Sequence, residues 1–170
     1  MKKKSLLVAG LACVCLLIAC IFLFVPIKRE EKVTMPAMIF SDAKSEIEQT
    51  NLTVEGTWIR SIATPSRQSF EGKIQVDSLD YTHKENGWDL NFQVTNDASE
   101  DYLSGGLFYN SDSDFTGYGW LYTNNNHTYY VLVTNLFNEQ NDDYIVIAPA
   151  ETEEEAKNIC NVMGLKFLQD

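Results

Sequence analysis

The chain has 170 residues, of which 24 are acidic and 13 basic, and its formal net charge is −11. Every acidic residue follows Arg29. Five of the basic residues lie at or before this position, namely Lys2, Lys3, Lys4, Lys28 and Arg29. The chain beyond Arg29 therefore holds 8 basic and 24 acidic residues and has a net charge of −16. A surface of this charge repels phosphate groups, so the sequence predicts no nucleic-acid partner.

The first feature along the chain is an uncharged, largely apolar run from Ser5 to Val25. A helix of about twenty residues can cross a hydrocarbon layer of about 30 Å, whereas the core of a cleaved secretory signal needs only about 7–15 apolar residues. Residues 1–26 are therefore predicted to be a membrane anchor with one transmembrane helix. The amino terminus is expected in the cytoplasm, and the domain that follows is expected outside it.

Within this run, Leu17-Ile18-Ala19-Cys20 resembles the lipobox of bacterial lipoproteins. The resemblance implies cleavage before Cys20 and a diacylglyceryl group on its thiol. Such proteins usually continue with a polar tether, but here the apolar run continues to Val25. An uncleaved span, a lipid anchor at Cys20 and a cleaved soluble form are the three alternatives, and the span is the first expectation.

Residues 27–50 mix charged residues with an apolar patch and are predicted to be a tether. One short helix is expected over Ser41–Gln49, with Ser41 as its cap and Asp42 near the favourable end of the helix dipole. Residues 51–170 are then predicted to form one extracytoplasmic domain, which is an ordinary size for a domain with its own core.

From Thr53 onward, apolar residues recur at every second position, as is typical of half-buried strands. Asn86-Gly87 predicts a tight hairpin turn, because a type I′ turn needs positive φ at both central positions. The segments 128–137 and 144–148 are apolar on both faces, so a further element must cover one of those faces. Strands are predicted over 53–58, 70–77, 88–95, 103–109, 118–122, 128–137 and 144–148.

The covering element is predicted to be a helix after the last of these strands. Thr152 and Glu155 have the spacing of a capping box, and Gly164 stands where a helix end is favoured. Leu165–Leu168 predicts a short closing strand. The apolar face of the helix follows the spacing i, i+3, i+4 and i+7, in Ala156, Ile159, Cys160 and Met163.

This order of elements, with Gly56-Thr57-Trp58 on an early strand, resembles the lipocalin-like, or calycin, barrels. The resemblance implies a mainly β fold, an antiparallel meander of about eight strands closed into a barrel with a helix packed outside. An open antiparallel sheet or a β-sandwich with a packed helix is the alternative. Members of that family often stack a basic residue on the tryptophan, for which Arg60, Lys157 and Lys166 are the candidates.

The resemblance also implies a cup that binds a small apolar ligand, because closing about eight strands can leave room inside. The ligand-binding candidates in the interior are Trp58, Trp88, Trp120, Tyr118 and Tyr122. The alternative is that aromatic side chains fill the interior and that the chain is a structural or immunity-type interaction protein of the bacterial cell envelope.

No pattern in the chain predicts catalysis. A nucleophilic Ser or Cys needs a neighbouring histidine, but His83 and His127 are expected to be exposed at loop edges and Cys160 to be buried. The chain is therefore predicted to be non-enzymatic and to use no cofactor.

A metal site is not predicted either. Asn110, Asp112 and Asp114 alternate like the first ligands of a calcium loop, but Phe115 and Leu121 stand where that loop requires glycine and a bidentate glutamate. The function expected from the sequence is that of a membrane-anchored β-domain that binds a small apolar ligand or a surface partner.

Overall fold

The computed structural model describes residues 10, 12–18, 20, 25–41, 46–62, 67–83, 90–95, 102–111, 114–135 and 143–168. In the predicted anchor, residues 12–18 are helical, and the thiols of Cys13, Cys15 and Cys20 are free and exposed. In these ranges no helix combines the length and the apolar character that a membrane crossing requires.

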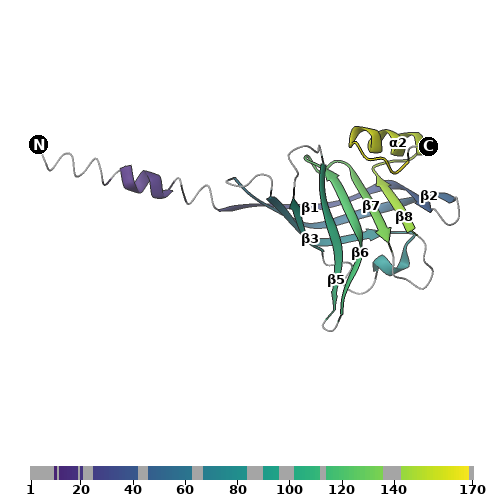
Figure 1. Ribbon diagram of the computed structural model, residues 1–170, viewed down its shortest axis with the longest axis horizontal. Coiled ribbons are helices and arrows are strands. Elements are labelled where there is room, and N and C mark those ends of the chain that lie inside the picture. The colour runs from purple at the N-terminus through teal and green to yellow at the C-terminus, as the bar shows by residue number, and fades with distance from the viewer. Residues whose placement is uncertain are drawn as a thin grey trace, which may run out of the picture.

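Eight antiparallel strands form one curled sheet (Figure 1), in the order β4-β3-β2-β1-β8-β7-β6-β5. Except for β4 and β5, strands that follow one another in the chain pair with each other, and β1 also pairs with β8. The sheet curls until Cα atoms of its two end strands, β4 and β5, lie within 8 Å of each other. This confirms the mainly β, barrel-like prediction as a curled half-barrel. The strands are β1 (Pro26–Ser41), β2 (Glu46–Ser61), β3 (Arg67–Val76), β4 (Leu90–Thr95), β5 (Tyr102–Ser111), β6 (Asp114–Asn124), β7 (Tyr130–Asn135) and β8 (Asp143–Ala148).

Strand β1 is the largest difference from the sequence prediction, because residues 27–41, which were expected to be part of a tether, belong to this 16-residue strand. It pairs with β2 along its whole length, but with β8 only over Met38–Ser41. The helix predicted over Ser41–Gln49 is wrong where the chain is described, since residues 46–49 belong to β2. Residues 42–45 lie outside the described ranges.

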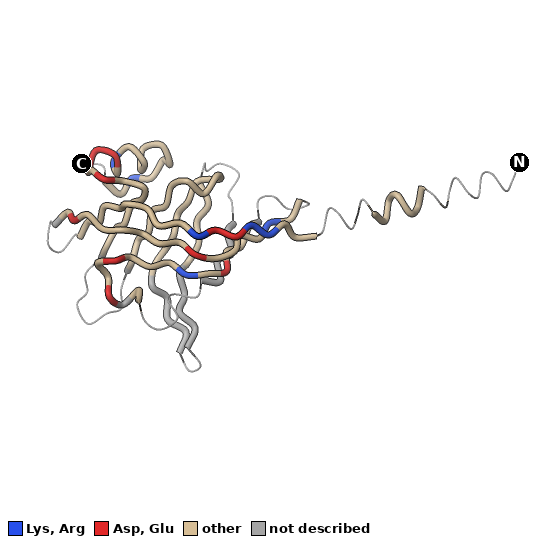
Figure 2. Tube along the Cα trace, turned by 180° about the vertical axis from the view of Figure 1, so that it is seen from behind, with Lys and Arg blue, Asp and Glu red and all other residues tan. Residues whose placement is uncertain are grey.

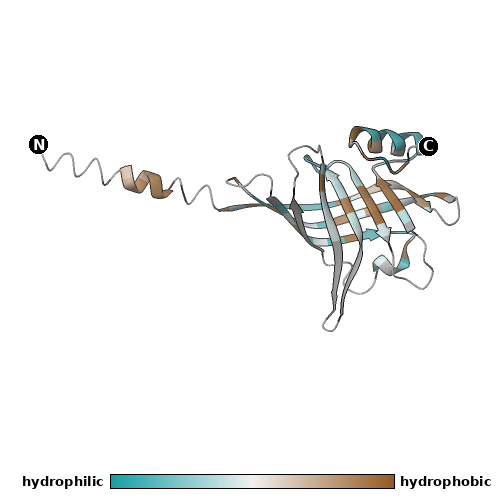
Figure 3. Cartoon of the chain, viewed as in Figure 1, coloured by the Kyte–Doolittle hydropathy of each residue, from teal (hydrophilic) through white to brown (hydrophobic). Residues whose placement is uncertain are grey.

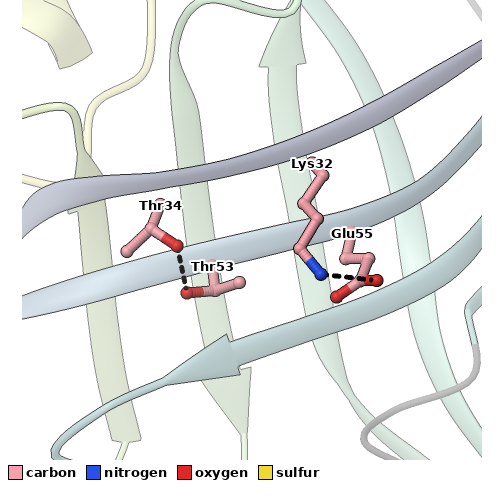
Figure 4. A network of polar contacts seen from close by, with 4 residues as sticks. All are labelled: Lys32, Thr34, Thr53 and Glu55. Atoms are coloured by element: carbon pink, nitrogen blue, oxygen red, sulfur yellow. Dashed lines mark hydrogen bonds and ion pairs between the residues drawn. The ribbon is translucent and has the colours of Figure 1, made fainter.

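The middle of the β1–β2 ladder carries polar side chains on its outer face, as Figure 4 shows. Lys32 and Glu55 form an ion pair at 3.0 Å, and the hydroxyl groups of Thr34 and Thr53 lie 2.9 Å apart. Both pairs join residues directly opposite each other in the ladder. Because the ion pair is exposed, it contributes little stability beyond fixing the register.

Strands β3 and β4 are antiparallel neighbours, as expected of a hairpin, but their described pairing does not extend to the predicted turn. Their pairing ends at Gly72 and Leu90, a register that a two-residue turn at Asn86-Gly87 would not give. The connection instead contains a 3-10 turn, η1 (Asp80–His83). Asn86, Gly87 and Trp88 themselves lie outside the described residues.

The predicted late helix is confirmed as α2 (Glu153–Val162). The Thr152 hydroxyl accepts a hydrogen bond from the backbone N–H of Glu155 at 3.2 Å, while the Glu155 carboxylate accepts from the N–H of Glu151 at 2.8 Å. Gly164, with φ of 70°, ends the helix as predicted. The closing strand predicted at 165–168 is wrong, because residues 165–166 have no regular structure and residues 167–168 form a turn, although Leu165 is buried.

Two hydrophobic clusters lie on the two faces of the curled sheet, and Figure 3 shows apolar bands crossing β7 and β8 next to α2. Alternate residues of the strands supply the two clusters, which explains why the late strands are apolar on both faces. The inner cluster comprises Met35, Ala37, Ile39, Leu52, Val54, Trp58, Phe70, Ile74, Val76, Leu79, Leu103, Leu121, Tyr130, Leu132, Val146 and Ala148. The outer cluster, beneath α2, comprises Met38, Val131, Ile147, Ala150, Ala156, Ile159, Cys160, Met163 and Leu165.

Candidate functional site

Four side chains from three different parts of the chain meet at one end of the inner cluster, and we call them the Glu31 cluster. The indole N–H of Trp58 donates to Glu31 Oε2 at 2.6 Å, and the Tyr130 hydroxyl donates to Glu31 Oε1 at 2.9 Å. The ring of His127 lies edge-on to Trp58, with ring centroids 3.7 Å apart. Both carboxylate oxygens of Glu31 are therefore held by donors from the sheet interior.

The Gly-x-Trp motif has a clear physical role at this end of the sheet. Gly56 and Gly72 face each other across β2 and β3, and Trp58 faces Phe70. A Cβ on Gly56 would lie 2.6 Å from the tip of the Phe70 ring, so the glycine leaves room for that ring. The Phe70 ring then packs on Trp58 with centroids 4.9 Å apart.

His127 is positioned by the turn between β6 and β7. The Asn124 side-chain oxygen accepts hydrogen bonds from the N–H groups of Thr128 at 2.7 Å and Tyr129 at 3.1 Å. This leaves His127 with a φ of 56° and turns its ring onto Trp58. The sequence prediction of an exposed His127 is therefore wrong, whereas His83 is exposed as predicted.

The surroundings keep both titratable rings of the cluster uncharged at neutral pH. Burial, followed by the positive charges of Arg29 and Arg60, lowers the pKa of His127 to about 4. Burial and the neighbouring Glu31 raise the pKa of Tyr130 well above its ordinary value, against a smaller opposing effect of Arg29. Within the described part of the chain, His127 Nδ1 is buried without a hydrogen-bond partner.

The altered pKa of His127 predicts a pH-dependent stability. The folded-state pKa of about 4 lies below the ordinary 6.5, so the unfolded chain takes up this proton first as the pH falls. The stability that depends on neutral His127 is present above about pH 6.5 and is lost between pH 6.5 and 4. His127→Gln should therefore show a smaller fall in melting temperature between pH 7 and pH 5 than the parent.

The matched control for this measurement is His83→Gln, because His83 is exposed and outside the cluster. The melting temperature of His83→Gln should fall between pH 7 and pH 5 by as much as that of the parent. Loss of packing on Trp58 will lower the melting temperature of His127→Gln at every pH, so the pH dependence is the informative quantity. Equal falls in all three proteins would refute a buried neutral His127.

Of the five predicted aromatic residues, the three whose side chains the structure describes do not lie together. Trp58 lies in the interior, but Trp120 is 51% exposed on the outer face, and Tyr122 packs in the outer layer against Tyr102 and Phe167. Trp88 lies outside the described residues.

Tyr118 is part of β6, but its side chain is not among those described. Of the basic candidates for the tryptophan, Arg60 is the one whose charge acts on the Glu31 cluster. Lys157 instead pairs with Glu153 at 2.8 Å.

Sequence reasoning missed Glu31 and Tyr130 as partners of Trp58. The sequence did contain a signal for this, because Glu31, Val33 and Met35 occupy alternate positions in the segment predicted to be a tether. Their side chains all lie on the inner face of the sheet. Five consecutive charged residues, 28–32, hid that alternation.

A pocket of about 310 Å³ lies away from the cluster, between the β1–β2 pair and the segment that leads into α2. Its rim is polar, and the Gln49 amide donates to the backbone carbonyl of Glu151 at 2.6 Å beside it. The lining residues are Pro36, Ala37, Gln49, Thr50, Asn51, Ala150 and Glu151.

Other reactive groups are few in the described ranges. No group of three or more His, Cys, Asp or Glu side chains there could hold a metal ion. Cys160 is buried as predicted, and burial raises the pKa of its thiol to about 11, which disfavours the nucleophilic thiolate.

Comparison of the chain with protein-family models, with curated proteins and with solved structures finds no match. The likeness to lipocalin-like barrels therefore consists of the curled antiparallel sheet and the helix outside it.

Proposed function

We propose that this chain is a membrane-anchored, extracytoplasmic interaction domain of the cell envelope that binds a partner protein through its outer face and catalyses no reaction. The observation that carries the proposal is the contrast between the two faces of the sheet. The inner cluster is closely filled, while Trp120 on the outer face is 51% exposed.

The filled interior favours a surface partner over an enclosed apolar ligand. Large inner side chains, such as Phe70, Leu121 and Leu132, have no exposed surface, and Trp58 is only 4% exposed. A ligand in this space would have to displace side chains that already pack on one another, which costs stability in a close-packed core.

The outer face offers an apolar row that α2 leaves partly open, and we call it the Trp120 strip. It consists of Phe40, Ile145, Val133 and Trp120, which lie opposite one another across β1, β8, β7 and β6. The first three are partly buried and Trp120 is exposed. Exposed tryptophan beside aliphatic residues is typical of the energetically important centre of protein interfaces.

The membrane attachment in this proposal rests on the uncharged run Ser5–Val25, whose residues 12–18 are helical. The two forms of attachment remain a single span and a lipid anchor at Cys20. In both forms β1 begins directly after the run, so the domain is held beside the membrane.

A photoreactive amino acid in place of Trp120 should crosslink to a partner in intact cells, because Trp120 is the most exposed residue of the strip. The matched control is the same amino acid in place of Asn125, which is exposed in the turn between β6 and β7. When the photoreactive amino acid is placed at another position of the strip, Trp120→Ala should abolish its crosslink to that partner. The melting temperature of Trp120→Ala should stay within about 2 °C of that of the parent. The same crosslinked species at both positions, or none at Trp120, would contradict the proposal.

Binding of a small molecule is the second candidate, and the observation that favours it is the pocket beside Gln49 and Asn51. Its volume of about 310 Å³ is at the small end of the range for ligand sites. The amide and hydroxyl groups on its rim would suit a small polar ligand with hydrogen-bonding groups better than the apolar ligand expected from the sequence.

A further inference from the structure

The end of the β1–β2 ladder nearest the apolar run differs in charge from the rest of the domain. We call it the neck, and it consists of residues 25–29 and 59–62. It carries Lys28, Arg29 and Arg60 and no carboxylate, whereas the chain beyond Arg29 has a net charge of −16. Figure 2 shows blue segments at the end of the sheet toward the N-terminus, with red segments directly after them, and both red and blue segments around α2.

The neck also exposes aliphatic side chains. Val25 and Ile62 are each 51% exposed and Ile27 is 40% exposed. The ladder places Pro26 opposite Ser61 and Ile27 opposite Arg60, so the apolar and cationic side chains of both strands gather at one end. Aliphatic residues interspersed with Lys and Arg are the composition that binds at the boundary between lipid head groups and acyl chains.

The neck lies next to the proposed anchor. Val25 ends the apolar run and β1 begins at Pro26, so Lys28 and Arg29 lie about 10–13 Å from the end of the run at about 3.3 Å per strand residue. This distance is close to the electrostatic screening length of about 10 Å at 0.1 M salt. Charges at such a distance remain attracted to anionic head groups.

We propose that the neck is a membrane-docking surface that binds anionic lipid head groups and holds the domain in a fixed orientation on the membrane. Val25, Ile27 and Ile62 enter the interfacial layer, and Lys28, Arg29 and Arg60 contact lipid phosphates. This inference rests on the proposed membrane anchoring and adds the lipid chemistry that the domain itself recognises.

The test uses the full chain reconstituted into vesicles of phosphatidylcholine alone or of phosphatidylcholine with phosphatidylglycerol. Flotation measures anchoring, and hydrogen exchange followed by mass spectrometry measures docking. Amides of residues 26–31 and 59–62 should exchange at least threefold more slowly on the anionic vesicles. Amides of α2 should exchange equally on both.

A matched pair of variants separates the neck from total charge. Lys28→Gln with Arg60→Gln removes two neck cations, and because each contributes about a fivefold preference for an anionic surface, the added protection should disappear. Lys157→Gln with Lys166→Gln removes two cations at the far end and should leave the protection intact.

The outcomes distinguish this inference from the function on which it rests. If the chain floats with both kinds of vesicle but the amides of the neck exchange hydrogen equally fast on both, the docking surface is refuted and the anchor is not. Loss of protection in both double variants would overturn the specific role of the neck. Failure to float with either vesicle would overturn the anchor and the docking surface together.

Discussion

Trp58→Ala is expected to lower the free energy of unfolding by about 3–5 kcal/mol, as is typical when a large buried aromatic residue is truncated. Trp58 is 4% exposed and packs against Phe70 and His127. Its loss also removes one of the two donors that hold Glu31. Urea unfolding at pH 7, followed by far-UV circular dichroism, measures the change.

Two variants show where that stability comes from. Trp58→Phe keeps an aromatic ring but removes the indole N–H, so it should cost about 1–3 kcal/mol, the usual cost of a buried acceptor that loses its donor. Trp120→Ala should cost less than about 1 kcal/mol, because that indole is half exposed. Similar losses for Trp58→Ala and Trp120→Ala would show that Trp58 does not occupy the core.

Gly56→Ala is expected to cost about 3 kcal/mol, at the upper end of the usual cost of overpacking. A Cβ there would lie 2.5 Å from the Glu71 carbonyl oxygen and 2.6 Å from both Gly72 Cα and the Phe70 ring tip. Two of these atoms belong to the backbone, so rotation of one side chain cannot relieve the contact. The change is measured by the same urea unfolding.

The control is Gly164→Ala, where a Cβ meets no atom within 4 Å. Its φ of 70° alone should cost about 1–2 kcal/mol. Adding Phe70→Leu to Gly56→Ala removes the ring tip but not the backbone contacts, so the double variant should remain less stable than Phe70→Leu alone. A cost for Gly56→Ala no larger than that for Gly164→Ala would contradict the close approach of β2 and β3.

Local patterns in the sequence predicted α2 well. The hydroxyl at Thr152, the apolar stripe from Ala156 to Met163 and the glycine at 164 act within a few residues of one another, and each has the predicted role in the structure. The alternation in β2, β3 and β8 was equally local and was also predicted. Strand β1 was missed because charged residues occupy both of its faces between Lys28 and Lys32, so the usual difference between an apolar and a polar face is absent.

The candidate site could not be assembled from the sequence because its contacts are long-range. Glu31 is 27 residues from Trp58 and 99 from Tyr130, and only the curling of the sheet brings them together. The aromatic residues of β6 were assigned to the interior because alternation separates two faces without saying which is inside. With α2 covering part of the outer face, Tyr122 is partly buried outside, while Leu121 is fully buried inside.

The pairing of β1 with β8 also determines when the domain can finish folding. Ile39 pairs with Val146, so the second edge of the first strand is completed only when the last strand has emerged from the ribosome. Contacts of such sequence separation form slowly, because the loop between them must close first. The domain is therefore expected to fold after its synthesis is nearly complete, and chains truncated before Asp143 should leave β1 open to pairing with other chains.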